Sequence, residues 1–492
     1  MRQVCVIVLV LLTAAANAWA QDAPPAVRDS VVKVYATYRG PSFDRPWTKE
    51  PPEEYTGTGF VIGGQRLLTN AHVVEQASQV FVQPPNSSDR LRAEVVAISQ
   101  EMDLAVLEIR RDSEADAFFG EHPPVTFRES LPPIGATVQA IGYPLGGDQL
   151  SVTEGVISRI EFVEYAQGVG GLRVQVDAAL NPGNSGGPMV LDGEVIGVNF
   201  SGLGNAENIG FVIPFEEVEL FLEDVADGSW DGKPRLHAGG FQTCENPALR
   251  DWLGLSADQT GLVYRKTTAR DEVPLESWDL VDRIGDYDVD NAGLITIEDG
   301  LRVAWAVLLQ RMGQDGSIPM TVIREGESVE LTVPVDKNDY EVVLPLGDNY
   351  PEYFVYGPLV FTKGYREMGW WIVYNPDSPL VKRGDTTRAF EDEELVLVSS
   401  QLLPHPITKG YEIVGNPLLK AVNGTKIENL AHLVETLRDL EDDFVEFTFY
   451  DRTQETLIFD RLAVDDAVEE ILEDNGIRNR LSPALRDLWP DE

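Results

Sequence analysis

Residues 181–188 read NPGNSGGP, in which three glycines and two prolines surround a single serine, Ser185. Such a stretch can be a plain surface turn, a loop that binds phosphate, or the seat of a nucleophile. A serine hydroxyl is barely ionised at neutral pH, so a nucleophilic Ser185 needs a histidine base and an acid that orients this base. The rest of the chain therefore decides between the three interpretations.

Candidates for both partners precede Ser185. Of the five histidines, His72 follows a strand-like run in LLTNAHVV and shares a strand-rich region with Ser185. Asp103 begins the apolar run DLAVLEI, where a buried carboxylate has to be paired, although an Asp that only caps a turn is the alternative. The order His72, Asp103, Ser185 is that of chymotrypsin-like enzymes and differs from subtilisin and the α/β-hydrolases. The three residues are our candidates for a catalytic triad.

The remaining sequence divides into further segments. Between Val31 and Pro214, short β-branched runs alternate with turn residues, which predicts an all-β barrel or sandwich. Two later units, 237–336 and 340–464, each read as strands around one helix. In the first of these units we expect the helix over 297–312, and we expect residues 465–492 to form a C-terminal helical extension.

Composition limits the location and the partners. Residues 1–20 combine a basic start, a short apolar run and Ala18-Trp19-Ala20, the pattern of a cleaved signal peptide, with an uncleaved signal anchor as the alternative. We therefore expect export to a bacterial periplasm, or secretion as second choice, with no membrane span after cleavage.

The net charge of −42 argues against nucleic acid as a partner. Cys244 is expected to be a buried, inert thiol, and we expect no metal or cofactor.

Five stretches, TGTGFVI, LLTNAHVV, DLAVL, NPGNSGGP and IGFVIP, together resemble the Deg/HtrA family of serine proteases. The resemblance implies a mainly β fold. A chymotrypsin-like double β-barrel would occupy 21–228, followed by two PDZ-like α+β domains, of which the second is degenerate. The C-terminal half is most similar to the two-PDZ branch of plant Deg proteases. Carried over, His72 is the general base, Asp103 orients it and Ser185 attacks.

The same resemblance implies an oxyanion hole at residues 183–185, a substrate pocket at 198–200 and a peptide-carboxylate loop at 239–241. The residues concerned are Gly183, Asn184 and Ser185, then Val198, Asn199 and Phe200, and finally Gly239, Gly240 and Phe241. The stretch HAGGFQ around the third group is equally compatible with an extended linker. Asn184 carries no charge, so the ion pair that switches on digestive proteases is excluded. Tyr38, Phe43 and Trp47 are candidates for a trimer interface, with an ordinary surface loop as the alternative.

We therefore expect an exported, ATP-independent serine endopeptidase of protein quality control. It would cleave unfolded or misfolded polypeptides through an acyl-enzyme, bind peptide C-termini at its first PDZ-like domain, and form a homo-oligomer, a trimer or a multiple of trimers. Two alternatives stay open: a chaperone or PDZ scaffold with a silent protease domain, and a signalling protease with one dedicated target.

Overall fold

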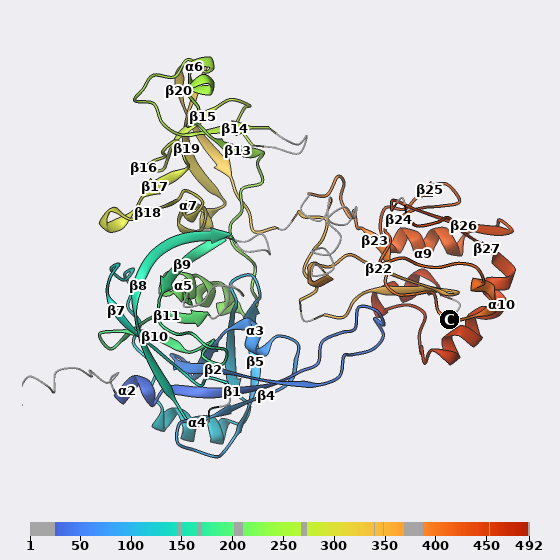
Figure 1. Cartoon of the computed structure of the whole chain (residues 1–492), viewed down its shortest axis with the longest axis horizontal. Coiled ribbons are helices and arrows are strands. Elements are labelled where there is room, and N and C mark those ends of the chain that lie inside the picture. Colours follow the sequence, from blue (N-terminus) through green and yellow to red (C-terminus); the bar gives the residue numbers. More distant parts are fainter. Residues whose placement is uncertain are drawn as a thin grey trace, which may run out of the picture. The chain divides into compact units, whose positions relative to one another are not determined.

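The computed structural model describes residues 25–490 except 146, 148, 165–169, 201–209, 267–272, 339, 348, 369–382, 384–386 and 452. The expected signal peptide at 1–20 lies outside these residues. The chain divides into two compact units, which are described separately (Figure 1). Unit 1 runs to Thr37 and resumes over Glu54–Lys337, and unit 2 combines Tyr38–Glu53 with the chain from Asn338 onward. None of the helices in the described ranges is long and apolar enough to cross a bilayer.

Unit 1 begins with a closed six-stranded barrel in the order β1-β2-β3-β6-β5-β4. Its interior is filled by β-branched and leucine side chains, for example Val32 and Leu107, which are fully buried. The strands are β1 (Val31–Tyr38), β2 (Glu53–Ile62), β3 (Arg66–Thr69), β4 (Ala77–Gln83), β5 (Leu91–Ser99) and β6 (Leu104–Ile109), with helices α2 (Pro25–Arg28), α3 (Ala71–Val74) and α4 (Asp112–Glu121).

A second closed six-stranded barrel follows, in the order β10-β11-β12-β9-β8-β7. Its elements are β7 (Thr137–Gly142), β8 (Ser151–Glu164), β9 (Gly170–Val176), β10 (Pro188–Leu191), β11 (Glu194–Phe200), β12 (Gly210–Pro214), α5 (Phe215–Asp224) and the 3₁₀ turn η1 (Val225–Asp227). The two barrels confirm the chymotrypsin-like architecture expected from the sequence.

Residues 237–336, expected to form the first PDZ-like domain, complete unit 1 with a sheet in the order β13-β14-β15-β19-β20, to which β16 adds at β15, and which we call the PDZ-like sheet. The strands in this range are β13 (Gly240–Thr243), β14 (Leu262–Arg265), β15 (Leu280–Ile284), β16 (Tyr287–Asp288), β17 (Leu294–Thr296), β18 (Arg302–Ala304), β19 (Ser317–Arg324) and β20 (Glu327–Pro334). The helical elements are α6 (Pro247–Trp252), η2 (Glu298–Gly300), α7 (Val307–Met312) and η3 (Gly313–Asp315).

The helix expected over 297–312 is much shorter than predicted. Only Val307–Met312 is α-helical, because residues before it form the hairpin β17–β18. Asp299 and Gly300, at the turn of that hairpin, have positive φ angles of 54° and 76°. A residue with this φ cannot continue a right-handed helix.

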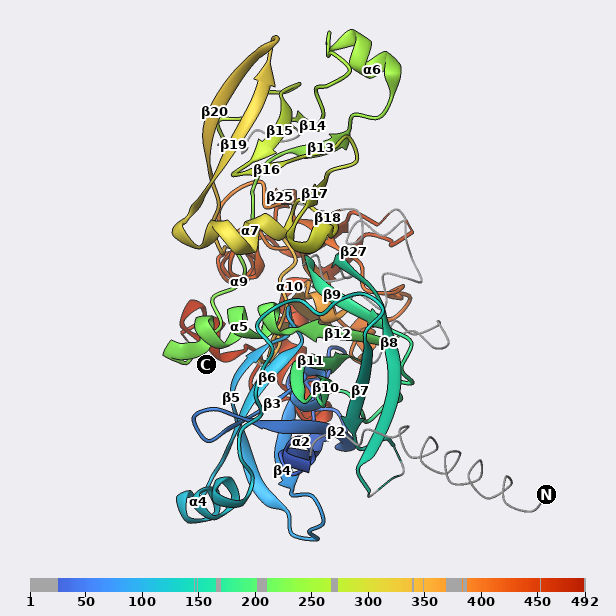
Figure 2. The same cartoon turned by 90° about the vertical axis from the view of Figure 1, so that its left-hand side faces the viewer.

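Helix α7 lies between the PDZ-like sheet and the second barrel, where it contacts β9 (Figures 1 and 2). A buried ion pair between Glu217 and Lys233 lies here and is hydrogen-bonded to α7. The Glu217 carboxylate on α5 is fully buried and accepts hydrogen bonds from Lys233 Nζ (2.5 Å), the Leu172 N–H (2.6 Å) and Gln310 Nε2 of α7 (2.8 Å). Burial alone would raise the pKa of Glu217, but the charges of Lys233 and Arg173 outweigh it and hold this pKa below its ordinary value.

The described residues of unit 2 form two sheets, in the orders β21-β22-β23 and β25-β24-β26-β27. The strands are β21 (Tyr353–Tyr356), β22 (Leu359–Lys363), β23 (Val396–Val398), β24 (Leu419–Val422), β25 (Thr425–Lys426), β26 (Phe444–Phe449) and β27 (Leu457–Asp460). The helical elements are η5 (Pro406–Thr408), α9 (Leu430–Arg438), α10 (Arg461–Asp474) and η6 (Pro483–Leu488). The C-terminal residues expected to be helical contain most of α10 and η6, and they pack into this unit, where Ile471 and Leu485 are buried.

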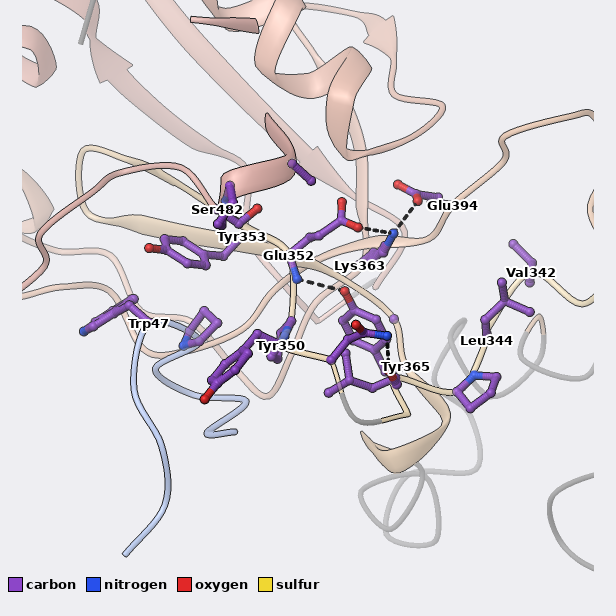
Figure 3. Close-up of a pocket in the computed structure, with 18 of the residues that line it drawn as sticks. Trp47, Val342, Leu344, Tyr350, Glu352, Tyr353, Lys363, Tyr365, Glu394 and Ser482 are labelled. Atoms are coloured by element: carbon purple, nitrogen blue, oxygen red, sulfur yellow. Dashed lines mark hydrogen bonds and ion pairs between the residues drawn. The ribbon is translucent and has the colours of Figure 1, made fainter. Parts of the chain in front are cut away.

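Residues 38–53 leave the first barrel between β1 and β2 and pack within unit 2. The Phe43 ring lies 6.2 Å from that of Tyr365, and the Trp47 ring lies edge-on to Tyr353 at 6.0 Å. Two of the three aromatics expected at a subunit interface therefore make contacts inside their own chain. Trp47 also lines a cavity of about 540 Å³ in which Lys363 is paired with two glutamates (Figure 3).

Candidate active site

The position of His72 follows from the single-turn helix α3 that succeeds β3. Ala71, Val73 and Val74 are buried in the first barrel, which leaves the His72 side chain 41% exposed. Asn70, the residue before α3, is fully buried, and its Nδ2 donates to the Asp103 carbonyl at 2.8 Å. This bond ties the histidine turn to the loop that carries the acid.

Asp103 lies in the turn between β5 and β6, with a φ of 56° that is uncommon for a residue other than glycine. The His72 N–H donates to Asp103 Oδ1 at 2.9 Å, and His72 Nδ1 lies 2.9 and 2.8 Å from the two carboxylate oxygens. Because a carboxylate only accepts hydrogen bonds, Nδ1 carries the proton in the neutral ring. The other ring nitrogen, Nε2, is then the basic atom.

The environment of His72 changes its pKa in two opposing ways. Burial of the ring lowers the pKa, whereas the charge of Asp103, the hydrogen bond to it and the charge of Glu75 raise it. The net result is a pKa above the ordinary value of 6.5. The pair is therefore arranged to stabilise a proton that His72 acquires during a reaction.

Ser185 lies in the loop between β9 and β10 and is 4% exposed. The Pro182 carbonyl of this loop accepts a hydrogen bond at 2.8 Å from the N–H of Leu145, which lies in the loop between β7 and β8. In a trans peptide the N–H points opposite to the carbonyl, so the Gly183 N–H is directed away from Leu145. Gly183 has a φ of 100°, and a Cβ there would lie 2.4 Å from the Tyr143 carbonyl, so only glycine fits.

The Asn184 N–H differs from the expected role in an oxyanion hole. It donates to the Asn181 carbonyl at 3.0 Å and so closes a turn within the loop. The Asn184 side chain is 2% exposed, and among the described residues its Oδ1 has no hydrogen-bond partner. Backbone amides of Gly183 and Ser185 are left as the candidates for stabilising an oxyanion.

Of the three expected pocket residues, Asn199 contacts the nucleophile loop through its backbone, because its carbonyl accepts from the Gly186 N–H at 3.1 Å, and Phe200 lies beside the candidate base. The Phe200 ring contacts that of His72, with centroids 6.1 Å apart and an interplanar angle of 76°. Val198 and Asn199 are fully buried, Val198 in the core between the barrels and Asn199 with its Nδ2 bonded to the Pro188 carbonyl at 3.2 Å. Residues 201–209, which follow Phe200, lie outside the described part.

The expected carboxylate loop lies at the start of β13, the strand at one end of the PDZ-like sheet. The Gly239 N–H donates to the Tyr264 hydroxyl at 3.2 Å. The Phe241 ring lies 5.5 Å from that of Tyr264 and 5.1 Å from that of Trp305. Cys244, at the end of the same strand, is fully buried, and burial raises the pKa of its thiol, so it is a poor nucleophile.

Sequence reasoning missed two residues that hold the site together, Asn70 and Thr58. Both lie inside the stretches quoted for their motifs, LLTNAHVV and TGTGFVI, and both are fully buried polar side chains. A polar residue within or directly after an apolar run is the signal that could have found them, because a buried polar group needs a partner.

Two domains of the chain match known protein families. Residues 57–198 match a trypsin-like peptidase domain, and residues 342–484 match a PDZ domain. The chain is 33% identical to the chloroplastic protease Do-like 2 of Arabidopsis thaliana, over 94% of this chain and 76% of that protein. It is 32% identical to the mitochondrial protease Do-like 4 of the same plant, over 83% and 76%. A solved HtrA-type protease, AlgW with a decapeptide, covers 64% of this chain and 97% of its own, with 25% identity and a TM-score of 0.47.

Proposed function

The chain belongs to the Deg/HtrA family and is a serine endopeptidase, and from this premise we propose that it is an exported, ATP-independent enzyme that cleaves unfolded or misfolded polypeptides. The catalytic part of this proposal rests on the His72–Asp103 pair. His72 Nδ1 lies 2.8 Å from Asp103 Oδ2, which leaves His72 Nε2 as the basic atom. A base in this state is what a neutral serine requires.

In the proposed reaction, His72 Nε2 takes the Ser185 hydroxyl proton while Oγ attacks the scissile carbonyl. The Gly183 and Ser185 amides stabilise the oxyanion that forms, and protonated His72 is stabilised by Asp103. The same proton then passes to the leaving amine, which leaves an acyl-enzyme on Ser185. Water, activated by His72, hydrolyses this ester and restores the serine.

The substrate class is inferred from the shape that a cleft of this fold accepts. A polypeptide has to enter it as an extended strand, which a folded protein does not offer. The strand β13, at the end of its sheet, supports a second peptide site, because an edge strand can pair with an added peptide strand. We infer export from the signal-like residues 1–20. We infer assembly into a homo-oligomer from membership of the family.

The proposal is tested by fluorophosphonate labelling and casein digestion with the wild type and with Ser185→Ala. We expect the wild type to be labelled and to degrade casein without ATP, and Ser185→Ala to do neither. A wild type that is never labelled and never cleaves would point to a chaperone or scaffold. Cleavage of a single protein in a native extract, with casein spared, would point to a dedicated signalling protease.

A matched pair of peptides tests the second site. A peptide with a carboxylate end and its amidated form are titrated against the full chain, with Phe241→Ala as the variant. Preferential binding of the carboxylate form, weakened in the variant, supports C-terminal recognition. Equal binding of both forms would instead assign internal peptide segments to this edge.

A further inference from the structure

One residue of the first barrel, Thr58, is hydrogen-bonded to both sides of the Ser185 peptide. It lies in β2 and is fully buried. Its Oγ1 donates to the Gly183 carbonyl at 2.7 Å and accepts from the Tyr143 N–H at 2.9 Å. Its own N–H donates to the Ser185 carbonyl at 2.9 Å. The nucleophile loop of the second barrel is thus held by a residue of the first.

These bonds hold the two peptide planes on either side of the one that carries the Ser185 N–H, a candidate donor of the oxyanion hole. The Gly183 carbonyl belongs to the plane between residues 183 and 184, and the Ser185 carbonyl to the plane between 185 and 186. The plane between them carries the Ser185 N–H. Since Thr58 holds the planes on either side, the Ser185 N–H has little freedom to turn.

The loop also has no room to move toward Thr58. A Cβ at Gly186 would lie 2.1 Å from the Thr58 carbonyl, and one at Gly187 would lie 3.0 Å from Thr58 Cγ2. The Thr58 carbonyl in turn accepts a hydrogen bond from Thr69 Oγ1 at 2.7 Å. Thr58 is therefore also held by a hydrogen bond within its own barrel, independently of its contacts with the second barrel.

We propose that Thr58 is a positioning residue for the reaction at Ser185, which sets the Ser185 amide of the candidate oxyanion hole from the first barrel. His72 and Asp103 also belong to the first barrel, so the same contact fixes the base relative to the nucleophile. The inference rests on the proposed use of Ser185. Without the Thr58 hydroxyl, the Gly183 carbonyl and the Tyr143 N–H would both be buried without this partner, and the loop would turn to find others.

The test compares Thr58→Ser with Thr58→Ala, because these two variants differ only in the hydroxyl. The matched control is Thr362→Ser with Thr362→Ala, since Thr362 is fully buried in unit 2 and its Oγ1 donates to the Glu352 carbonyl at 2.7 Å. For each variant, kcat and KM are measured with a fluorogenic peptide, together with the affinity for a peptide aldehyde, which requires the oxyanion hole once it binds covalently. Thermal unfolding gives the folded fraction used for normalisation.

We expect Thr58→Ala to lower kcat by about 10- to 100-fold, below the 100- to 1000-fold typical of removing a donor itself. The affinity for the aldehyde should fall by a similar factor while KM changes by less than about 3-fold. Thr58→Ser should stay within about 3-fold of the wild type, and neither Thr362 variant should change kcat.

The inference is overturned if Thr58→Ala keeps the wild-type kcat, if Thr58→Ser loses as much as Thr58→Ala, or if the Thr362 pair shows the same loss. If Thr58→Ala does not fold, Thr58→Cys replaces it, because a thiol is a weak donor of similar size to the serine hydroxyl. The Ser185→Ala variant distinguishes a failure of the proposed function from a failure of the role assigned to Thr58. Activity that survives in Ser185→Ala refutes the proposed function, whereas an inactive Ser185→Ala beside a fully active Thr58→Ala refutes only the role of Thr58.

Discussion

Replacing Lys233 by methionine should destabilise unit 1 strongly, because it leaves the Glu217 carboxylate buried without its paired charge. Breaking one side of a buried ion pair typically costs about 3–5 kcal/mol. Two hydrogen bonds to Glu217, from Leu172 and Gln310, and the charge of Arg173 remain. We therefore expect the lower end of that range, about 3 kcal/mol, which is more than a 100-fold change in the unfolding equilibrium.

The assay is hydrogen–deuterium exchange of the full chain at increasing urea, read on peptides from β9 and α7, which report unit 1 alone. The control is Lys426→Met, an exposed lysine in β25, expected to stay within about 0.5 kcal/mol of the wild type. The double variant Glu217→Gln with Lys233→Met removes both charges and should recover most of the loss. A Lys233→Met protein as stable as the control, or a double variant no better than the single one, would refute this account.

The pH dependence has a defined sign. The pKa of Glu217 is held below its ordinary value of 4.5, so the stability gained from its charged form is present above that pH and is lost as the pH falls through the lowered pKa. In the Lys233→Met variant the pKa of Glu217 is lowered less, because the charge of Lys233 is missing. The difference in unfolding free energy between wild type and variant should therefore narrow on acidification below about pH 4.5.

Three further perturbations test the site and unit 2. Asp103→Asn should lower kcat on the order of 10⁴-fold and move the acidic limb of the pH–rate profile downward, because Asp103 holds the pKa of His72 above 6.5; an unmoved limb would contradict that assignment. Gly183→Ala should abolish fluorophosphonate labelling although the chain remains folded by circular dichroism, since its Cβ has no space at a φ of 100°; a labelled variant would show that the loop adapts. Trp47→Ala should destabilise unit 2 by about 1–3 kcal/mol, less than a fully buried tryptophan, and exchange protection of peptides around Tyr353 measures it; unchanged protection would mean that residues 38–53 do not stabilise this unit.

The double barrel could be predicted from the sequence because its strands are short, β-branched and separated by turn residues, a pattern with few alternatives. The helix at 297–312 could not, because Val303 and Val307, four residues apart, satisfy a helical pattern and are also buried in a hairpin followed by a short helix. The outcome depends on Asp299 and Gly300, whose positive φ angles follow from the tertiary structure.

At the candidate site, the order of His72, Asp103 and Ser185 along the chain made these three residues the candidates for a triad. The structure places the first two in contact. The conformation of the nucleophile loop could not be predicted from the sequence. It depends on a bond between Pro182 and Leu145, in different loops, and on no property of either residue alone. The use of the Asn184 amide inside its own turn was hidden for the same reason.

Because residues 38–53 belong to unit 2, the domains of this chain are not consecutive pieces of sequence. A chain cut after Lys337 would keep both barrels and the first PDZ-like domain, yet would expose the Phe43 and Trp47 rings to water. The reciprocal fragment, beginning at Asn338, would lack one wall of its cavity. Dissection of this enzyme into halves therefore has to move or mutate residues 38–53 as well, or a loss of solubility will be mistaken for a loss of function.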